Sequence, residues 1–177
     1  MVDAVRPAVP IDAPLPDGLL VRRVESADLP AVTGLLADYN QYVSAPPVSL
    51  WVGNGISEES VRSRINRSGH VMWIAEMEGS AAGLIEAVDG VSGAADIVSG
   101  GRGLGIKCAH VMPQWRGRGV GTALLSAALI WANKRDVQMC FVDFEAFNPT
   151  ARRFWLRYFS PVCFSVVRHI DRRTVPM

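Results

Sequence analysis

The run Arg116-Gly117-Arg118-Gly119-Val120-Gly121 is the most informative part of this chain. An apolar segment, residues 104–111, precedes the run, and a helical pattern over residues 122–135 follows it. Glycine lets the backbone turn tightly and approach a ligand closely. The first N–H groups of a helix have no acceptor within the helix, and the helix dipole makes that end positive. Strand, glycine-rich turn and helix therefore predict an anion site, to which the two arginines add charge.

Two familiar phosphate loops do not fit this run. A Walker loop ends in Gly-Lys-Ser/Thr, whereas Gly121-Thr122 contains no lysine, which argues against an NTPase. The dinucleotide pattern G-x-G-x-x-G fails because Thr122 or Leu124 stands where the third glycine is required. The alternative without a ligand is a tight strand-to-helix turn, but a turn alone does not require glycines flanked by arginines.

A third pattern does fit. The motif R-x-x-G-x-G/A is satisfied by Arg116, Gly119 and Gly121. One helix and one strand further on, Asn148-Pro149-Thr150-Ala151 is followed by Phe154-Trp155, which satisfies N-x-x-A-x-x-aromatic. These two blocks, in this order and at this distance, closely resemble the coenzyme A site of the GNAT N-acetyltransferase superfamily.

The resemblance extends over residues 18–170, and its specific part is residues 104–159. It implies an α/β fold of the α+β type, with a mixed central sheet that is flanked by helices and splays between two parallel strands, here residues 104–111 and 137–144. Splaying leaves backbone groups unpaired, and in the family the pantetheine arm of acetyl-CoA pairs with them. The resemblance thus assigns pantetheine to Ala109, His110 and Val111, the pyrophosphate to Arg116, Gly117, Arg118, Gly119, Val120, Gly121 and Thr122, and the channel wall to Asn148.

The rest of the chain predicts an order of elements similar to that fold. The proline-rich residues 1–17 are interpreted as a flexible or docked extension before a domain at 18–177. Ser26 is predicted to cap one helix, and residues 57–60 to open another. Strands are predicted at 19–24, 70–77, 81–89, 104–111, 137–144 and 161–170, helices at 27–39, 57–67, 122–135 and 149–158, and loops at 38–56 and 90–102.

Composition narrows the function classes. With 177 residues, 49% of them hydrophobic, the chain predicts one domain with a stable core. A net charge of +1 gives no field that would attract nucleic acid or a membrane surface. The chain contains no apolar run of membrane-spanning length, and residues 1–7 do not resemble a secretory signal.

Cysteine and histidine usage points to a reducing compartment without a metal site. An odd number of cysteines in apolar surroundings predicts buried free thiols in the cytoplasm, with a catalytic thiol as the alternative. The histidines show no metal-ligand spacing, so no metal is expected. The residues concerned are Cys108, Cys140, Cys163, His70, His110 and His169.

Acetyl transfer to an amine requires the loss of a proton, because an alkylammonium has a pKa of about 10.4 and only the free amine attacks a thioester. A positioned base contributes about 10²–10⁴-fold. In several family members this base is a glutamate or histidine on the central strand. By spacing from Arg116 those positions fall on Gly105 and Lys107. The usual base is therefore missing or displaced.

Three carboxylates are candidate replacements. Glu86 lies in phase with apolar neighbours on a predicted strand, where burial would help it to accept a proton. Asp143 and Glu145 share one face of the strand before Asn148, where either could read the acceptor amine or relay its proton. The structural alternatives are a salt-bridged Glu86 and a solvated pair or partners for the arginines at 152 and 153.

Aromatic residues supply the remaining candidates. Many family members carry a tyrosine acid seven residues after the asparagine, but that position is Trp155 here, and Tyr158 is the possible replacement. Tyr39, Tyr42 and Trp51 are predicted to form an aromatic wall for the acceptor. Packing in the core is the alternative for all of these rings. The glycine-rich residues 89–103 suggest a loop that closes on the substrate.

The sequence thus predicts a cytoplasmic N-acetyltransferase that moves an acetyl group from acetyl-CoA to a primary amine by direct transfer in a ternary complex. The acceptor is a small molecule or a peptide, and its identity is open. The alternative is a non-catalytic acyl-CoA-binding sensor of the same fold. Nucleic-acid binding is poorly supported, because no stacking aromatics interleave the arginines. The last predicted strand could pair across a homodimer.

Overall fold

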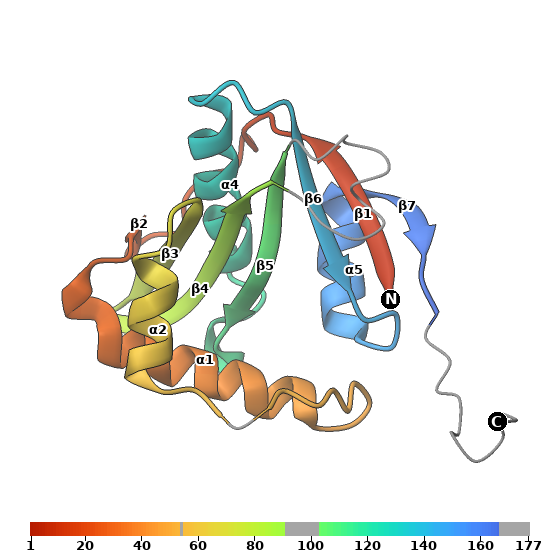
Figure 1. The fold of residues 1–177 in the computed structure, drawn as a ribbon. Helices are drawn as coiled ribbons and strands as arrows, with labels where there is room; N and C mark the ends of the chain where they lie inside the picture. The colour runs from red at the N-terminus through yellow and green to blue at the C-terminus, as the bar shows by residue number, and fades with distance from the viewer. Residues whose placement is uncertain (54, 91–102, 167–177) are drawn as a thin grey trace, which may run out of the picture.

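The computed structural model describes residues 1–53, 55–90 and 103–166, which form one seven-stranded sheet with helices on both faces (Figure 1). The strand order is β2-β3-β4-β5-β6-β1-β7. The strands are β1 (Val2–Pro7), β2 (Leu19–Arg23), β3 (His70–Met77), β4 (Ser80–Asp89), β5 (Leu104–Val111), β6 (Met139–Phe144) and β7 (Ser160–Phe164). The helices are α1 (Leu29–Ser44), α2 (Glu58–Ile65), α4 (Val120–Asn133) and α5 (Pro149–Tyr158), with 3-10 turns at Ser26–Asp28 and Pro113–Trp115.

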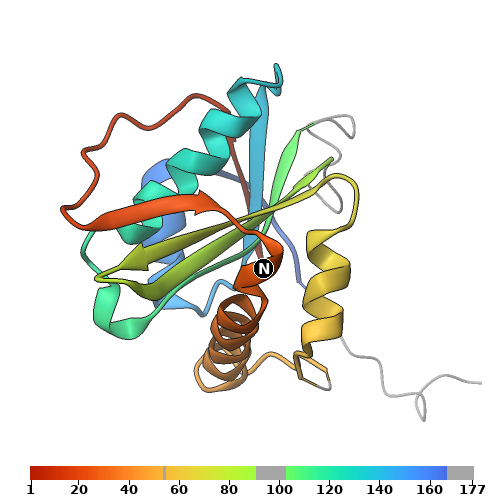
Figure 2. The same cartoon turned by 90° about the vertical axis from the view of Figure 1, so that its left-hand side faces the viewer.

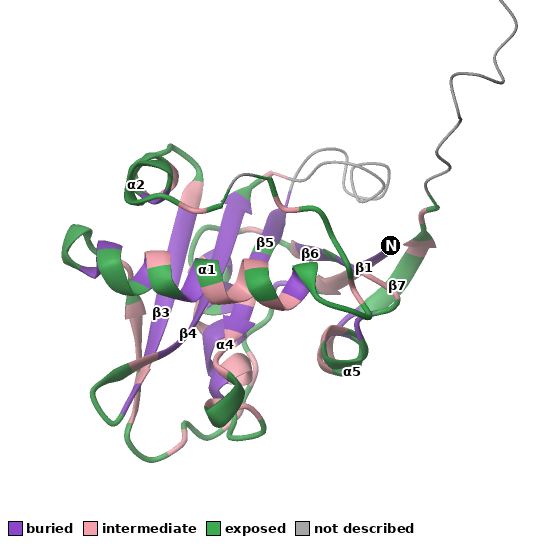
Figure 3. Ribbon diagram, turned by 90° about the horizontal axis from the view of Figure 1, so that it is seen from below, coloured by how far each residue is buried: buried purple, intermediate pink, exposed green. Residues whose placement is uncertain are grey.

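Two hydrophobic layers hold the helices against the sheet. On one face, α1 and α2 pack through a cluster that contains Val32, Val61 and Ile74. On the other face, α4 and α5 pack through a larger cluster that contains Leu124 and Trp155 (Figure 2). Strands β3, β4 and β5 lie between these layers and are buried almost along their whole length (Figure 3). Because helices cover both faces of these strands, their sequences are nearly continuous apolar runs.

Strands β5 and β6 are parallel neighbours at one end only. Their pairing runs from Leu104 and Cys140 to Ile106 and Val142, and every other pair in the sheet is antiparallel. Beyond Ile106, β5 has no partner in β6 among the described residues, and the two ribbons diverge toward α1 (Figure 1). The mixed sheet and its predicted splay between these strands are therefore confirmed.

A β-bulge at Lys107 lies where the two strands part. Glu86 pairs with Cys108 and Ala87 pairs with Ile106, so Lys107 is the extra residue on β5. An extra residue reverses the alternation of side chains beyond it. Accordingly, Ile106 belongs to the cluster on the α4 side and Cys108 to the cluster on the α1 side. The bulge therefore decides which side chains of β5 face α1.

The N-terminal segment differs from the prediction. The sequence predicts an extension over residues 1–17, but Val2–Pro7 form β1 inside the sheet, antiparallel to both β6 and β7. Ala4 at its centre is 0% exposed. The strand signal is weak because only Val2 and Ala4 mark the inward face before the prolines begin. Val2–Pro7 are thus part of the sheet. Of the predicted extension, residues 8–17, between β1 and β2, lie outside any helix or strand.

Helix α1 is the other element whose bounds were predicted wrongly. Ser26 does not cap it: a 3-10 turn precedes the helix, which begins at Leu29 with Asp28 at its N-cap. The helix also continues to Ser44, because its buried stripe extends to Val43. The predicted loop at 38–56 therefore begins seven residues later, at Ala45.

The remaining predicted elements are confirmed to within a few residues. Helix α5 has its predicted bounds, and the hairpin of β3 and β4 turns at Glu78 and Gly79, which both have positive φ. Ser57 caps α2 as predicted by accepting from the Ser60 N–H. Two predicted parts lie outside the described residues, namely 91–102 of the glycine-rich loop and 167–170 of the last strand.

An ion-pair network joins β2 to the start of α1. Asp28 accepts from Arg22 Nη1 at 2.6 Å and Nη2 at 2.7 Å, and from the Glu25 backbone N–H at 2.8 Å. The hydrogen bonds from Arg22, helped by that from Glu25, hold the pKa of Asp28 below its usual value. Because an amide cannot accept all three bonds, we expect Asp28→Asn to lower the free energy of unfolding by about 1–3 kcal/mol at pH 7.

The pH dependence of this loss follows from the lowered pKa. The stabilisation is complete above the unfolded pKa of about 4 and is lost as the pH falls through the lower folded value. Urea denaturation should therefore show a difference between wild type and Asp28→Asn that is full at pH 7 and shrinks below pH 4. The exposed Asp136→Asn is the matched control. An equal loss in both variants, or a loss that persists in acid, would contradict this account.

Candidate active site between the parted strands

The glycine-rich loop ends β5 and starts α4. Gly117 and Gly119 have φ of 73° and 83°, a conformation that disfavours side chains. Gly119 is the N-cap of α4, so the next three N–H groups, of Val120, Gly121 and Thr122, have no acceptor within the helix. A Cβ at Gly117 would meet nothing within 4 Å, so the loop is open there. The loop geometry fits the predicted anion site.

Both arginines of the loop lie over aromatic rings. The guanidinium carbon of Arg118 is 5.1 Å from the ring centre of Trp115, and that of Arg116 is 4.8 Å from the ring centre of Tyr42. Arg116 Nε also donates to the Val111 carbonyl at 2.9 Å. Arg116 therefore ties the end of β5 to α1, a role that the motif does not reveal, whereas Arg118 remains exposed beside the loop.

The edge of β5 that borders the gap offers backbone hydrogen-bonding groups. The Met112 N–H donates to the Ala82 carbonyl at 2.9 Å, so the backbone N–H of Met112 points toward β4. Because backbone direction alternates along a strand, the N–H and C=O groups of Ala109 and Val111 point toward the gap. Neither residue has a partner in β6 within the described chain. An extended amide chain would find partners here, which fits the arm of coenzyme A.

Asn148 and Tyr42 connect the helices across the open end of the gap. Asn148 Oδ1 caps α5 by accepting from the Ala151 N–H at 3.0 Å, and it also accepts from the Tyr42 hydroxyl at 3.0 Å. Tyr42 belongs to α1, which runs below β5 toward the start of α5 (Figure 1). Asn148 thus joins α5 to Tyr42 of α1, and its place in a cofactor channel stays a prediction.

His110 faces α1 rather than the gap. The backbone N–H and C=O groups of His110 point toward β4, where His110 pairs with Leu84. Its side chain is buried, and Nε2 lies 2.6 Å from Asp38 Oδ2. The rings of Tyr39 and Tyr42 have centres 6.0 and 6.4 Å from the imidazole. Burial lowers the pKa of His110, opposed by Asp38, and burial raises the pKa of Tyr39. Burial therefore disfavours the charged forms of the His110 imidazole and of the Tyr39 hydroxyl.

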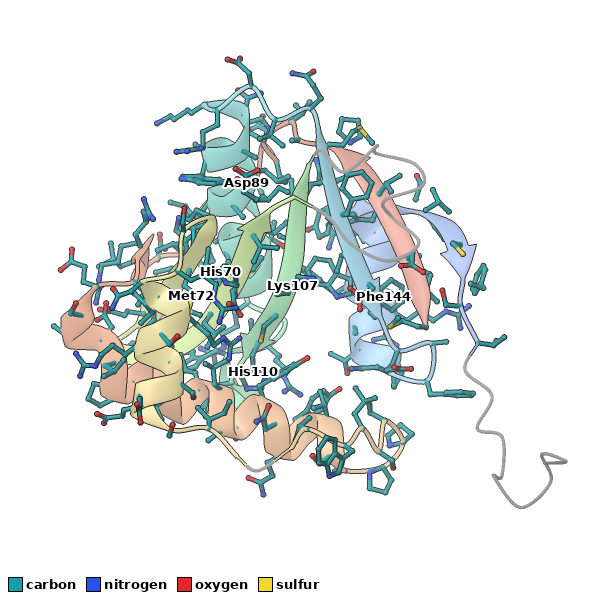
Figure 4. The ribbon with its side chains drawn as sticks, viewed as in Figure 1. His70, Met72, Asp89, Lys107, His110 and Phe144 are labelled. Atoms are coloured by element: carbon teal, nitrogen blue, oxygen red, sulfur yellow. The ribbon has the colours of Figure 1, made fainter. Side chains whose placement is uncertain are left out.

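Asp143 lies on β6 beyond the last residue that pairs with β5. Its strand neighbours point into the core on the α4 side, so by alternation Asp143 points to the α1 side. These neighbours are Cys140, Val142 and Phe144. Lys107 lies where β5 and β6 part, and His110 lies further along β5 toward α1 (Figure 4). The gap is therefore bordered by a cation on β5 and a carboxylate on β6.

The electrostatic surroundings of Asp143 favour its protonated form. Asp143 is exposed by its solvent-accessible surface. The chain packed around it nevertheless raises its pKa by desolvation, Asp3 and Glu145 raise the pKa further, and Lys107 opposes them. The charge of Asp143 in turn contributes to the raised pKa of Tyr39, which places α1 within electrostatic reach. A carboxylate with a raised pKa is a better proton acceptor than an ordinary one. Of the three predicted carboxylates, Asp143 combines this property with a place beside the gap.

Glu86 occupies a different position from the one predicted for a base. Its side chain is buried, 1% exposed, and it is ion-paired with Arg64 through Oε2. Its Oε1 lies 3.1 Å from His70 Nδ1 and 3.3 Å from Arg64 Nε. Both carboxylate oxygens are therefore engaged by α2 and β3. This arrangement agrees with the alternative interpretation of Glu86 as a salt-bridged residue.

Tyr158 and Trp155 lie on the α4 side of the sheet. The Tyr158 hydroxyl is 2.8 Å from Thr122 Oγ1, in the first turn of α4, which places it near the anion loop. Trp155 is buried in the core cluster on the same side. A Cβ at Gly121 would lie 3.2 Å from Phe154, so α5 packs closely on the loop. Tyr158 thus holds the start of α4, while its role as an acid stays a prediction.

The predicted aromatic wall is only partly brought together. Tyr39 and Tyr42 share the surroundings of His110, but Trp51 is 88% exposed.

All three cysteines are free. Within residues 1–53, 55–90 and 103–166, no group of three or more His, Cys, Asp or Glu side chains could hold a metal ion. None of the helices in those ranges combines the length and apolarity of a membrane span.

Sequence reasoning missed three contributors to the site. Asp38 orients His110, Arg64 engages Glu86, and Asp3 lies opposite Asp143. Each contact joins elements that are distant along the chain. No local pattern in the sequence marks them.

Comparison with known proteins identifies the fold. The structure is similar to a ribosomal-protein-alanine N-acetyltransferase from Brucella melitensis biovar Abortus 2308, with a TM-score of 0.67 and 16% identity over 86% of this chain and 99% of that one. It is also similar to an aminoglycoside acetyltransferase from an uncultured soil metagenomic sample in complex with sisomicin, with a TM-score of 0.63 and 18% identity over 88% and 95%. A third similar structure is the aminoglycoside N-acetyltransferase AAC(6')-Iy in complex with CoA, with a TM-score of 0.64 and 17% identity over 90% and 99%.

At these identities the structural similarity shows the fold alone. No curated protein sequence matches the chain significantly. The family assignment comes from the sequence, which matches the acetyltransferase (GNAT) family over residues 38–159. This match covers most of the chain and includes the end of α1 from residue 38, the parted strands, the glycine-rich loop and α5. The chain therefore belongs to the GNAT acetyltransferase family.

Proposed function

We propose that this protein transfers the acetyl group of acetyl-CoA to a primary amine in a direct ternary complex. The observation that carries the proposal is the gap between β5 and β6, which adjoins a left-handed glycine loop and the start of α4. An amide chain and a diphosphate joined end to end match these two features. Coenzyme A has this composition, and the similar structure of AAC(6')-Iy contains CoA.

The residues that would hold acetyl-CoA follow from the geometry. The N–H groups at the start of α4 and the open side of Gly117 would bind the diphosphate, with Arg118 beside them. The backbone of Ala109 would pair with the pantetheine amides. Asn148 would line the channel between α1 and α5. Acetyl-CoA supplies the reactive thioester in this arrangement.

The acceptor amine would bind on the α1 side of the gap. Asp143 and Glu145 would attract a positively charged ammonium, and Tyr39 and Tyr42 would border it. Two of the similar structures are acetyltransferases of aminoglycosides, and one of them is bound to sisomicin. These likenesses support a small amine acceptor. A peptide acceptor is supported by the ribosomal-protein-alanine acetyltransferase.

The chain contributes proton transfer and positioning. Asp143 would take one proton from the ammonium, which frees the nitrogen lone pair. The transfer then forms a C–N bond and breaks the C–S bond of the thioester, and the thiolate leaves with the second proton of the amine. Losing the first proton costs about 4–5 kcal/mol at pH 7 for an amine of pKa about 10.4. A carboxylate positioned to accept this proton contributes about 10²–10⁴-fold to the rate.

A non-catalytic acyl-CoA sensor is the second candidate. Two observations favour it: Gly105 has no side chain at a usual base position, and Trp155 is buried in the core instead of offering an acid. Purified protein should be mixed with acetyl-CoA and a panel of mono- and polyamines, and free thiol release should be followed. Release supports the transferase. Binding of acetyl-CoA without release on any amine supports the sensor.

A paired substitution at Gly117 tests the diphosphate site. Asp and Asn both tolerate a left-handed backbone, and a Cβ at this position meets no neighbour, so both variants should fold. A carboxylate about 5 Å from a phosphate costs about 1–3 kcal/mol. We therefore expect Gly117→Asp to bind acetyl-CoA about 10–100-fold more weakly than Gly117→Asn in calorimetric titrations. Equal affinities of the two variants would place the diphosphate elsewhere.

A further inference from the structure

The first strand of the chain places a second carboxylate against Asp143. In the antiparallel pairing of β1 and β6, Asp3 is directly opposite Asp143. Asp3 is 4% exposed, and its Oδ2 accepts from Ser165 Oγ at 3.0 Å. Residues directly opposite in antiparallel strands have Cβ atoms about 4.5–5.5 Å apart. The two carboxyl groups are therefore held close to each other.

The register of the strands enforces this proximity. Val2 and Ala4, on either side of Asp3, are buried in the core on the α4 side. A shift by one residue would move both out of the core, so the pairing is fixed by hydrophobic burial. Like charges directly opposite each other destabilise a sheet. An acidic pair in a fixed register is thus a feature that the fold maintains at a cost in stability.

Asp143 is surrounded by charged or titratable groups from four elements. Asp3 faces it from β1, Lys107 from β5 and Glu145 from the segment after β6, and Tyr39 lies within electrostatic reach on α1. Asp3 and Glu145 raise the pKa of Asp143, and Lys107 lowers it. Asp3 and Lys107 therefore act on the same carboxyl in opposite directions.

We propose that Asp3 is a positioning residue that acts through Asp143, so that the carboxylates of β1 and β6 draw the proton of a bound ammonium more strongly than Asp143 alone would. This inference rests on the proposed function, because it takes Asp143 as the proton acceptor of acetyl transfer. It also gives β1 a role in the reaction in addition to its place in the sheet. The reacting amine touches Asp143 and not Asp3.

The test compares two variants that are expected to shift the titration midpoint of Asp143 in opposite directions. Asp3→Asn keeps an oxygen that can accept from Ser165 and removes the negative charge, so less repulsion opposes ionisation of Asp143. Its titration midpoint should fall by about one pH unit. Lys107→Met should move the midpoint upward. The measurement is the ¹³C carboxyl shift of Asp143 by NMR, with Asp136→Asn as the control that leaves the midpoint unchanged.

Kinetics separate this inference from the proposed function. The acid limb of kcat/KM should move to lower pH in Asp3→Asn and to higher pH in Lys107→Met, in step with the NMR midpoints. Thermal melts check that each variant is folded. An active enzyme whose midpoint and acid limb are the same in Asp3→Asn as in Asp136→Asn overturns the role of Asp3 and leaves acetyl transfer standing. Bound acetyl-CoA without turnover in wild type overturns acetyl transfer itself.

Discussion

Asp143→Asn is expected to lower kcat/KM for amine acetylation by about 10²–10⁴-fold, the usual contribution of a positioned base. The amide has the shape of the carboxyl group but cannot take a proton from the ammonium. Asp143 lies beside the gap on the α1 side, and desolvation raises its pKa. The loss should appear in steady-state thiol release with saturating acetyl-CoA. Acetyl-CoA affinity should stay within about twofold, because Asp143 is not among the residues proposed to hold acetyl-CoA.

The pH profile and a matched variant make this result specific. Below its pKa, the protonated Asp143 no longer accepts a proton, so wild type should lose activity in acid along a limb that Asp143→Asn lacks. Glu145→Gln removes a charge two residues away and should cost far less. Activity that survives Asp143→Asn but is lost in Glu145→Gln would move the proton acceptor to Glu145. Full activity in both variants would exclude both residues as the proton acceptor.

Ala4→Pro is expected to lower the free energy of unfolding by about 3–5 kcal/mol and the melting temperature by about 10 °C. Ala4 lies in the middle of β1, between Val142 of β6 and Pro161 of β7, and has no exposed surface. Proline there removes a donor from the ladder and leaves its acceptor unpaired. Its ring also overfills a closed core position. Urea denaturation and calorimetry measure the change.

Val9→Pro is the control for this substitution. Val9 lies just beyond β1, is exposed, and contributes its carbonyl to Arg6 Nη2, which proline preserves. It is expected to change stability by less than about 1 kcal/mol. If Ala4→Pro were as mild as Val9→Pro, Val2–Pro7 would not be a central strand in solution. The residues 1–17 would then match the extension that the sequence predicts.

The elements that could be predicted from the sequence are those with strong local signals. Helix α5 has Asn148 as its cap and a proline at its first position, and its bounds were predicted correctly. Strand β5 was predicted from a largely apolar run, interrupted by Lys107 and His110. Strand β1 and the end of α1 were not, because their stability comes from neighbours far away in the sequence. Val43, for example, extends α1 by packing in the core and not by any helix signal.

The same distinction applies to the site. The glycine loop could be predicted because it needs only glycines at closely spaced positions before a helix, here Gly117 and Gly119 with positive φ. The contacts of Arg116 with Val111 and Tyr42 could not, because they depend on where α1 crosses the end of β5. The pairing of Asp3 with Asp143 depends on strand order and register. No local sequence pattern indicates where α1 crosses β5 or how the strands are ordered and paired.

The place of β1 also sets the order in which the chain can assemble. β1 comes first along the chain, but its two neighbours in the sheet, β6 and β7, come last. Contacts over such long separations form slowly, because loop closure opposes them. On the ribosome, therefore, β1 cannot pair with β6 until synthesis has passed Phe144, and it cannot pair with β7 until synthesis has passed Phe164. The half of the sheet that carries Asp143 is then the last to close.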